Sequence, residues 1–308
     1  MIRYLLLALF AVTSLATAKP QKAPQKLPGG WVYAWGDEFN GSKLDTRKWK
    51  YELGVVRNQG SRHAYTKDCV KVRKGMLVLE SRCEEIPNET YKPGGKTWFQ
   101  KIKTQPYASG SITSLGTQSF TPPCRLEFRA KVPKGRGVWP AIWTMHQNKY
   151  GWPANGEIDI LEHISQEPNR VYSIFRWGKN GGNQEHKVIR TTDIRDLSKD
   201  FHTYVLEWTD EYMFMEIDGK EVGRIKISDA QYPNGDNPLL TPCYLITTRL
   251  SAVGRRLPWL RIIPLSSSST TCAATPNPVT STPTERLMRR ADERARGASA
   301  VKTVATDF

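Results

Sequence analysis

The sequence predicts an all-β protein built as a single β-sandwich. Between residues 31 and 246, short runs of strand-forming residues alternate with turn signals, as in 125–132. One hairpin is explicit, because the strand-type run 213–217 leads directly into Asp218-Gly219, a dipeptide typical of two-residue β-turns. Helical periodicity is nearly absent along this stretch, which favours one sandwich of many short strands over two smaller domains.

Three carboxylates lie within six residues on one of the predicted strands. Because side chains alternate between the two faces of a strand, Glu157 and Asp159 share one face, and Ile158 and Ile160 point into a core. Glu162 has the opposite parity, and one β-bulge between Asp159 and Glu162 would return it to the carboxylate face. Two carboxyl groups held close together are the catalytic groups with which most glycosidases cleave a glycosidic bond. The spacing therefore predicts a bulged strand and a glycosidase site.

Tryptophans surround the acidic strand in the sequence. Trp139 and Trp143 are four residues apart, so they share one face of the preceding strand, and Trp177 follows the acids. Flat aromatic rings stack on sugar rings, and we therefore expect Trp139 and Trp143 to line a sugar-binding cleft. The alternative for any single tryptophan is a place in the core between the two sheets.

Both ends of the chain differ from this central region. Residues 1–18 have the basic start, apolar run and small-residue cleavage site of a signal peptide, and residues 19–30 form a flexible leader. We therefore expect a secreted or periplasmic protein with no membrane insertion after cleavage, because no other segment is long and apolar enough to span a bilayer. Residues 265–308 are Ser/Thr/Pro-rich and then highly charged, a composition that predicts disorder.

Charge and cysteine content narrow the classes of partner. The net charge of +15 would suit anionic partners, but the chain has no nucleic-acid-binding motif, so we expect a basic surface and no nucleic-acid partner. The five cysteines lack the spacing of a zinc site. Cys69 and Cys83 flank an apolar run, and either a disulfide across a hairpin or two independent thiols fits that arrangement.

The order of motifs around the acidic strand resembles glycoside hydrolase family 16. The resemblance covers about residues 31–246, and its landmarks include Gly36–Gly41, Trp139–Trp143 and Trp152–Asn155. It implies a concanavalin-like jelly-roll β-sandwich over residues 31–264, with a concave substrate cleft and a polysaccharide substrate. No cofactor is required and no catalytic metal is expected, and we expect a monomer. Relatives often hold a structural calcium ion, to which Glu38 could contribute here.

The E-x-D-x-x-E spacing looks like the branch of that family that carries the bulge, which includes laminarinases, agarases and carrageenases. The resemblance implies a retaining mechanism in which Glu157 is the nucleophile and Glu162 the acid/base. Asp159 would hydrogen-bond Glu157 and tune both pKa values. Residues 151–156 look most like endo-1,3-β-glucanases that act on laminarin. The alternatives are an endo-hydrolase of galactans, of the agarase or carrageenase type, and a non-catalytic carbohydrate-binding sandwich.

Two segments depart from the laminarinase pattern. The strand after the acidic one carries Arg176 and Trp177 where those enzymes usually have a histidine, and Arg57-Asn58 stands where an Asn-Glu pair is common. Arg57, Asn58 and Trp177 are therefore included among the candidate substrate-binding residues. The arginines leave room for an anionic galactan as the substrate.

The end of the predicted domain departs further. The family closes its sandwich with a final strand after a Gly-rich loop, and that strand is missing after Ile246. With permitted codons for residues 262–275, reading two bases later gives a strand-like run that ends Asp-Tyr-Val-Arg-Gly-Tyr. We therefore hypothesise that a frameshift underlies residues 265–308. Resequencing of the open reading frame tests this, and an unbroken frame through Phe308 contradicts it.

Overall fold

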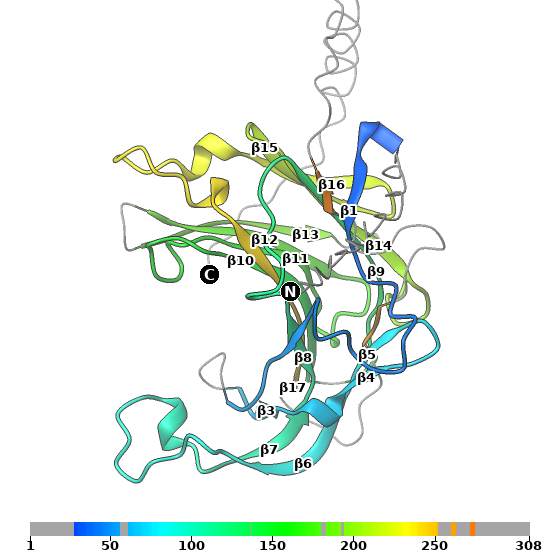
Figure 1. Cartoon of the computed structure of the whole chain (residues 1–308), viewed down its shortest axis with the longest axis vertical. Helices are drawn as coiled ribbons and strands as arrows, with labels where there is room; N and C mark the ends of the chain where they lie inside the picture. Colours follow the sequence, from blue (N-terminus) through cyan, green and yellow to red (C-terminus); the bar gives the residue numbers. More distant parts are fainter. Residues whose placement is uncertain are drawn as a thin grey trace, which may run out of the picture.

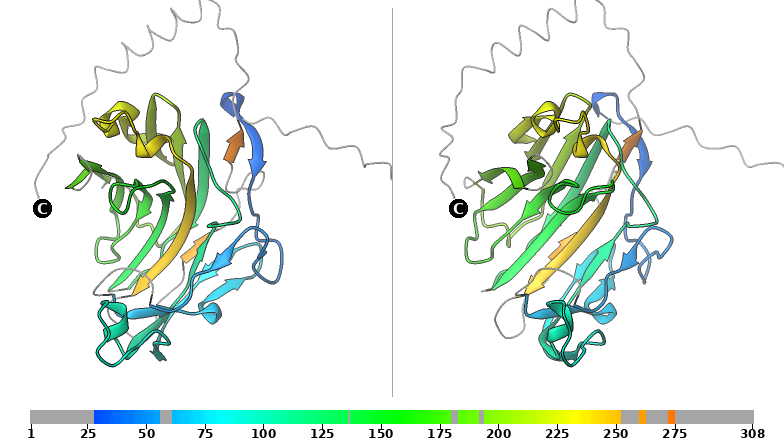
Figure 2. Two further views of the ribbon diagram at one scale, coloured as in Figure 1. Left: turned by 60° about the vertical axis from the view of Figure 1, so that its left-hand side comes forward. Right: turned by 90° about the vertical axis from the view of Figure 1, so that its left-hand side faces the viewer.

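The computed structural model describes residues 28–55, 61–135, 137–179, 183–191, 194–251, 260–262 and 272–274. Two seven-stranded antiparallel sheets form its main body, and this architecture confirms the predicted all-β jelly-roll sandwich (Figures 1 and 2). The sheet that carries the three carboxylates, here called the acidic sheet, has the strand order β13 (Asn183–Thr191), β12 (Val171–Lys179), β11 (Glu157–Glu162), β10 (Val138–His146), β17 (Cys243–Ser251), β8 (Ser111–Thr113) and β2 (Lys50–Tyr51).

The second large sheet, here called the opposite sheet, packs against the inner face of the acidic sheet. Its strand order is β16 (Lys220–Lys226), β15 (Tyr212–Ile217), β14 (His202–Trp208), β9 (Cys124–Lys131), β18 (Leu260–Ile262), β5 (Leu77–Leu79) and β4 (Val70–Val72). Short 3-10 turns join the strands: η1 (Pro28–Gly30), η2 (Lys67–Cys69), η3 (Phe99–Lys101), η4 (Ile227–Ala230) and η5 (Pro238–Leu240).

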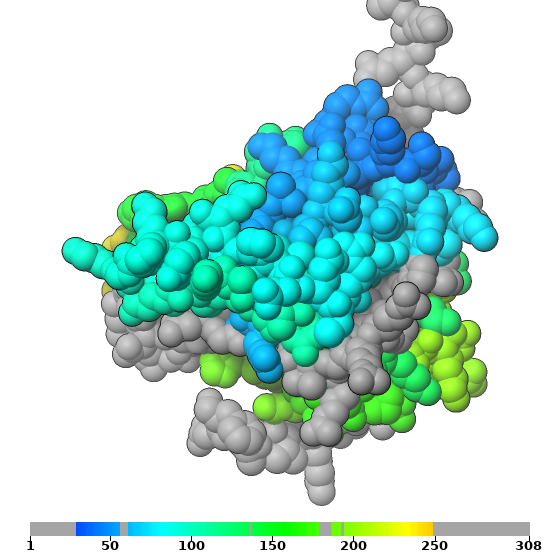
Figure 3. Space-filling model, turned by 90° about the horizontal axis from the view of Figure 1, so that it is seen from below, coloured from blue at the N-terminus to red at the C-terminus, as the bar shows by residue number. Residues whose placement is uncertain are grey.

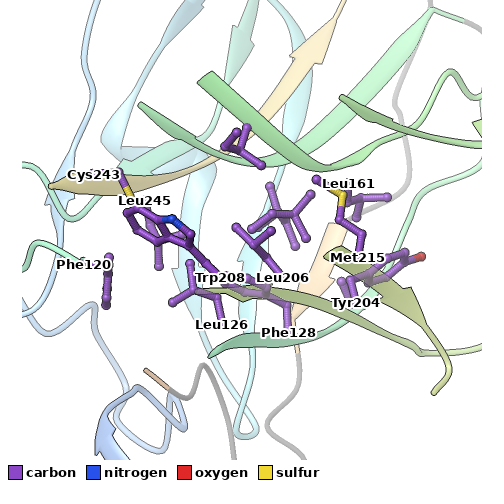
Figure 4. Close-up of a cluster of buried hydrophobic side chains, with 14 of the residues drawn as sticks. Phe120, Leu126, Phe128, Leu161, Tyr204, Leu206, Trp208, Met215, Cys243 and Leu245 are labelled. Atoms are coloured by element: carbon purple, nitrogen blue, oxygen red, sulfur yellow. The ribbon is translucent and has the colours of Figure 1, made fainter. Parts of the chain in front are cut away.

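A continuous apolar core fills the space between the two sheets. Every second side chain of β9 is buried, and Leu126 and Phe128 of that strand belong to the same cluster as Leu161 of the acidic sheet (Figure 4). Trp208 of β14 is also buried and packs edge-on against His146 of β10. Burial of each large apolar side chain is worth on the order of 1.5–3 kcal/mol, so this core fixes the acidic sheet against the opposite sheet.

The predicted hairpin is present in the opposite sheet. It joins β15 to β16 through Asp218 and Gly219, whose φ angles are 51° and 77°. Two successive positive φ values define the type I′ turn, whose twist matches that of the flanking strands. The Asp218 carboxylate also accepts a hydrogen bond from the backbone N–H of Thr203 at 2.9 Å and lies 2.7 Å from Nδ1 of His202. The turn is thereby tied to the start of β14.

A third sheet of three strands lies at one end of the sandwich, in the order β3 (His63–Tyr65), β7 (Thr104–Ser109) and β6 (Ser81–Pro87). Strand β3 runs parallel to β7, and β6 runs antiparallel to it. Figure 3 views this end, where blue and cyan residues from the first part of the chain form much of the surface.

Cys69 and Cys83 are both free thiols, which decides between the two arrangements that the sequence allowed.

The ends of the chain differ in part from the expectation. Strand β1 (Val32–Trp35) pairs with β19 (Cys272–Ala274), so three residues of the tail predicted to be disordered form a strand. Strand β18 lies between β9 and β5, so a three-residue strand follows Ile246 although the sequence predicted no closing strand. The predicted signal peptide, most of the predicted leader and the rest of the tail lie outside the described residues. Within the described ranges, no helix has the length and apolarity to cross a membrane.

Candidate active site

The acidic strand β11 contains the predicted bulge. Against β12, Glu157 stands opposite Arg176 and Asp159 opposite Ile174, but Glu162 stands opposite Tyr172. The acidic strand thus advances three residues while its neighbour advances two, which is one extra residue on β11. The extra residue lets Glu162 rejoin the face that carries Glu157 and Asp159, as the spacing predicted.

The side chains between the acids anchor the bulge. Ile158, Ile160 and Leu161 are all buried in the core of the sandwich. Two consecutive core residues at 160 and 161 are possible only where the alternation of a regular strand is broken. The apolar residues of the motif therefore hold the bulge in place, and the bulge places the third carboxylate.

The Glu157 carboxylate is held at both oxygens. Its Oε1 lies 3.0 Å from Nε of Arg176, and its Oε2 accepts a hydrogen bond from the indole Nε1 of Trp152 at 2.9 Å. The same Arg176 Nε donates to Oδ2 of Asp159 at 3.2 Å. Asp159 is the more buried of the two acids, with 4% of its side chain exposed against 13% for Glu157. One guanidinium therefore bridges two carboxylates on the outer face of the sheet.

The electrostatics separate the proton affinities of the acids. Burial, followed by the charges of Glu162 and Glu157, raises the pKa of Asp159 well above its ordinary value. Burial also raises the pKa of Glu162 to about 7; Glu157 adds to the rise, while Arg176 and a hydrogen bond from Trp139 oppose it. A carboxyl group that keeps its proton near neutral pH, beside one paired with a cation, has the properties of an acid/base next to a nucleophile.

The aromatic residues divide between the outer face and the core. Register with β17 places Trp139 and Trp143 of β10 on one face, as predicted, and Trp139 is 41% exposed. Trp177 was expected among the substrate-binding residues, but it belongs to the core cluster and is 9% exposed. The reason is parity: Arg176 points outward beside Glu157, so its neighbour Trp177 points inward.

Trp152 stands in the landmark segment 152–155 but was not among the candidate site residues that the sequence predicted. It is 58% exposed, yet its indole donates to the candidate nucleophile. The available signal was its place in the short segment just before the acidic strand, but the contact depends on how the loop folds back.

A second loop fixes the loop that carries Trp152. The hydroxyl of Tyr232 donates to the carbonyl of Ala154 at 2.6 Å and accepts from the N–H of Gly178 at 3.0 Å. Tyr150 packs edge-on against Tyr232, and its hydroxyl donates to Asp236. Residues 147–156 are therefore braced against residues 231–240 and against the end of β12. This bracing holds Trp152 beside Glu157.

Two other expectations concern residues beyond this cluster. Arg57 and Asn58 lie outside the described residues. Glu38, which could contribute to a calcium site, is described, and within the described part of the chain no group of three His, Cys, Asp or Glu residues could hold a metal ion.

Comparison with known proteins gives consistent matches. The family model described as "Glycosyl hydrolases family 16" matches residues 65–253. A beta-glucanase of Rhodothermus marinus is 34% identical over 221 residues, covering 68% of this chain and 68% of the relative. A glucan endo-1,3-beta-glucosidase of Niallia circulans is 30% identical over 243 residues, covering 70% of this chain and 33% of that longer protein.

One solved structure has a higher sequence identity to this chain. This structure is described with the words "Prominent members of the human gut microbiota express endo-acting O-glycanases to initiate mucin breakdown". Its sequence is 44% identical, the TM-score is 0.74, and the match covers 78% of this chain and 91% of that one. The similarity therefore extends to the whole sandwich.

Proposed function

The chain belongs to glycosyl hydrolases family 16, and from that premise we propose that Glu157 and Glu162 are the catalytic pair of a retaining endo-glycosidase. The observation that carries this proposal is the separation of proton affinities within one cluster. Glu162 holds its proton to about pH 7, while Glu157 faces the guanidinium of Arg176 at 3.0 Å. A retaining glycosidase needs one acid of each kind, and the two flank the scissile bond.

The proposed reaction has two steps. In the first, a carboxylate oxygen of Glu157 attacks the anomeric carbon, while Glu162 transfers its proton to the departing glycosidic oxygen. This forms a covalent glycosyl-enzyme ester and releases the first sugar fragment. In the second, Glu162, now ionised, removes a proton from water, which attacks the same carbon and releases Glu157. Asp159 shares Arg176 with Glu157 and remains beside it throughout.

For the substrate, we propose the O-glycan chains of mucin-type glycoproteins. The structure related to endo-acting O-glycanases is 44% identical to this chain, against 34% and 30% for the glucan hydrolases. The segment 173–177, which lacks the histidine usual in a laminarinase, also supports a substrate other than laminarin. The second candidate is a laminarin-type 1,3-β-glucan, which residues 151–156 and the similarity to the beta-glucanase and the glucan endo-1,3-beta-glucosidase favour.

A substrate panel tests the proposal. Purified protein is incubated with mucin O-glycans, laminarin, lichenan, agarose and κ-carrageenan, and the products are identified by mass spectrometry. We expect internal cleavage of O-glycan chains, with oligosaccharide products. Release from laminarin alone would favour the second candidate, and release from agarose or κ-carrageenan the galactan alternative. Binding without release from any glycan would support the non-catalytic sandwich.

Two variants test the assigned roles. Glu157→Gln should lose at least about 1,000-fold in kcat, because the amide cannot form the glycosyl ester. Glu162→Gln should lose similarly on natural glycans, but much less on an aryl glycoside whose leaving group needs no proton. A fully active Glu157→Gln variant refutes the assigned nucleophile.

We also propose that the protein is exported and that residues 1–18 are removed. The basic start, apolar run and small-residue site support this proposal. Amino-terminal sequencing of the mature protein should begin at Lys19, and a retained Met1 contradicts it.

A further inference from the structure

Arg176 is the cation at the centre of the carboxylate cluster. It lies on β12 directly opposite Glu157, and its Nε is within 3.2 Å of carboxylate oxygens of both Glu157 and Asp159. Only 22% of its side chain is exposed. The charge of this guanidinium is therefore directed at the acids of its own chain and is largely withheld from solvent.

The two strands next to β12 supply the titratable groups that face Arg176. Strand β11 contributes Glu157, Asp159 and Glu162, and on β13 the residue opposite Arg176 is His186. With Glu157 ionised and the two other acids protonated, the cluster contains one negative and one positive charge. Without the guanidinium, the same cluster would hold an uncompensated carboxylate next to two further acids, which favours protonation of all three.

We propose that Arg176 is a positioning residue that orients the Glu157 carboxylate for attack and keeps it ionised. This inference rests on the proposed function of Glu157. The carboxylate is held at one oxygen by Arg176 and at the other by Trp152, so its plane is fixed relative to the strand. A side chain held in this way reaches its reactive geometry without a search among rotamers.

The competing interpretation makes Arg176 a subsite for an anionic substrate, as the sequence allowed. A substrate sulfate would then have to compete for the guanidinium with the ionised Glu157 and with the carboxyl oxygen of Asp159. Its attraction to Arg176 would be offset by repulsion from Glu157. The geometry therefore assigns Arg176 to Glu157 rather than to a charged group of the glycan.

Three variants separate these interpretations. Arg176→Gln removes the positive charge. Arg176→Lys keeps the charge but replaces the planar guanidinium, with its several N–H donors, by a single ammonium group. Arg170→Gln is the matched control. Arg170 precedes the same strand but pairs with Glu167 and not with the catalytic acids. For each variant, kcat, KM and the pH dependence of kcat/KM are measured on an O-glycan oligosaccharide with and without a sulfate ester.

For Arg176→Gln we expect kcat to fall about 100-fold with KM changed less than about threefold, because orientation is lost and binding is not. Both limbs of the pH profile should move about one unit towards alkaline pH. The guanidinium favours the ionised form of both glutamates, so its removal raises both pKa values. Arg176→Lys should keep the limbs of the wild type with kcat reduced about tenfold. Arg170→Gln should match the wild type.

The opposite pattern overturns the proposal. If Arg176→Gln raises KM for the sulfated oligosaccharide alone, with unchanged pH limbs, Arg176 is an anion subsite. If that variant does not fold, Arg176→Lys decides by kcat and KM alone: a lower kcat with unchanged KM supports the positioning role, and a raised KM for the sulfated oligosaccharide alone overturns it. If the wild type cleaves no glycan, the proposed function fails, and NMR titration of ¹³C-labelled glutamate carboxyls still tests Arg176. In folded protein, the Glu157 signal should titrate at higher pH in an Arg176 variant lacking the charge, and identical titrations refute the inference.

Discussion

Replacing Glu162 by glutamine should stabilise the folded protein at alkaline pH while removing its activity on natural glycans. The pKa of Glu162 rises from 4.5 to about 7 on folding, chiefly because the carboxyl is buried. A raised pKa means that the folded state binds the proton more tightly than the unfolded state. Stability from this group is therefore fully present below about pH 4.5 and is lost as the pH rises through about 7.

The magnitude follows from the size of the pKa change. Each pKa unit corresponds to 1.36 kcal/mol, so the ionised carboxylate costs the folded state about 3 kcal/mol at pH 8. Glutamine is neutral at every pH and has nearly the same shape, so it avoids this cost. The free energy of unfolding of Glu162→Gln should then exceed that of the wild type by about 3 kcal/mol at pH 8 and by close to zero at pH 4.5.

Urea unfolding followed by tryptophan fluorescence measures this difference at the two pH values. Titratable groups distant from Glu162 affect both proteins equally and cancel in the comparison. Glu89→Gln is the matched control, because Glu89 is exposed on a loop. It should show almost no pH-dependent difference from the wild type. A Glu162→Gln variant that is no more stable than the wild type at pH 8 refutes the reasoning.

Three further predictions follow from the structure. Deletion of Ile160 should remove the bulge yet keep all three carboxylates on one face, because Glu157, Asp159 and Glu162 then follow the two-residue repeat of a regular strand; circular dichroism should show a retained fold, and activity should fall far less than in Glu162→Gln. Gly178→Ala should destabilise the protein by about 1–3 kcal/mol in urea unfolding, because the new Cβ would lie 2.6 Å from that of Ala154. Burial lowers the pKa of His146 to about 4, so the unfolded state takes up a proton that the folded state excludes. Stability should therefore fall by about 3 kcal/mol between pH 6.5 and pH 4, and His146→Gln should weaken this dependence in urea titrations.

Local alternation was enough to predict much of the site. It placed Glu157 and Asp159 on one face and the isoleucines between them in the core, and it placed Trp139 and Trp143 together. These features depend only on the two-residue repeat of a strand, which any stretch of sequence carries within itself. The bulge was predictable for the same reason, since the spacing of the third acid violated that repeat.

The strand after the acids shows where this reasoning stops. Both faces of β12 carry large side chains, so the sequence did not decide whether Arg176 or Trp177 points outward. The pairing of β12 with β11 decided it, and placed Arg176 opposite Glu157. Register between strands is set by contacts between distant parts of the chain, which a single strand does not specify.

The sequence by itself determined the fold class, the three acids and the bulge, because each follows from spacing within one short segment. The tertiary structure alone decided which cation holds Glu157, that Trp152 reaches its second oxygen, and that Trp177 belongs to the core. Those outcomes depend on strand register and on a loop braced by Tyr232, which is 78 residues further along the chain than its partner Ala154. The sequence therefore supplied the acids, and the packing of the sheet and its loops supplied their partners.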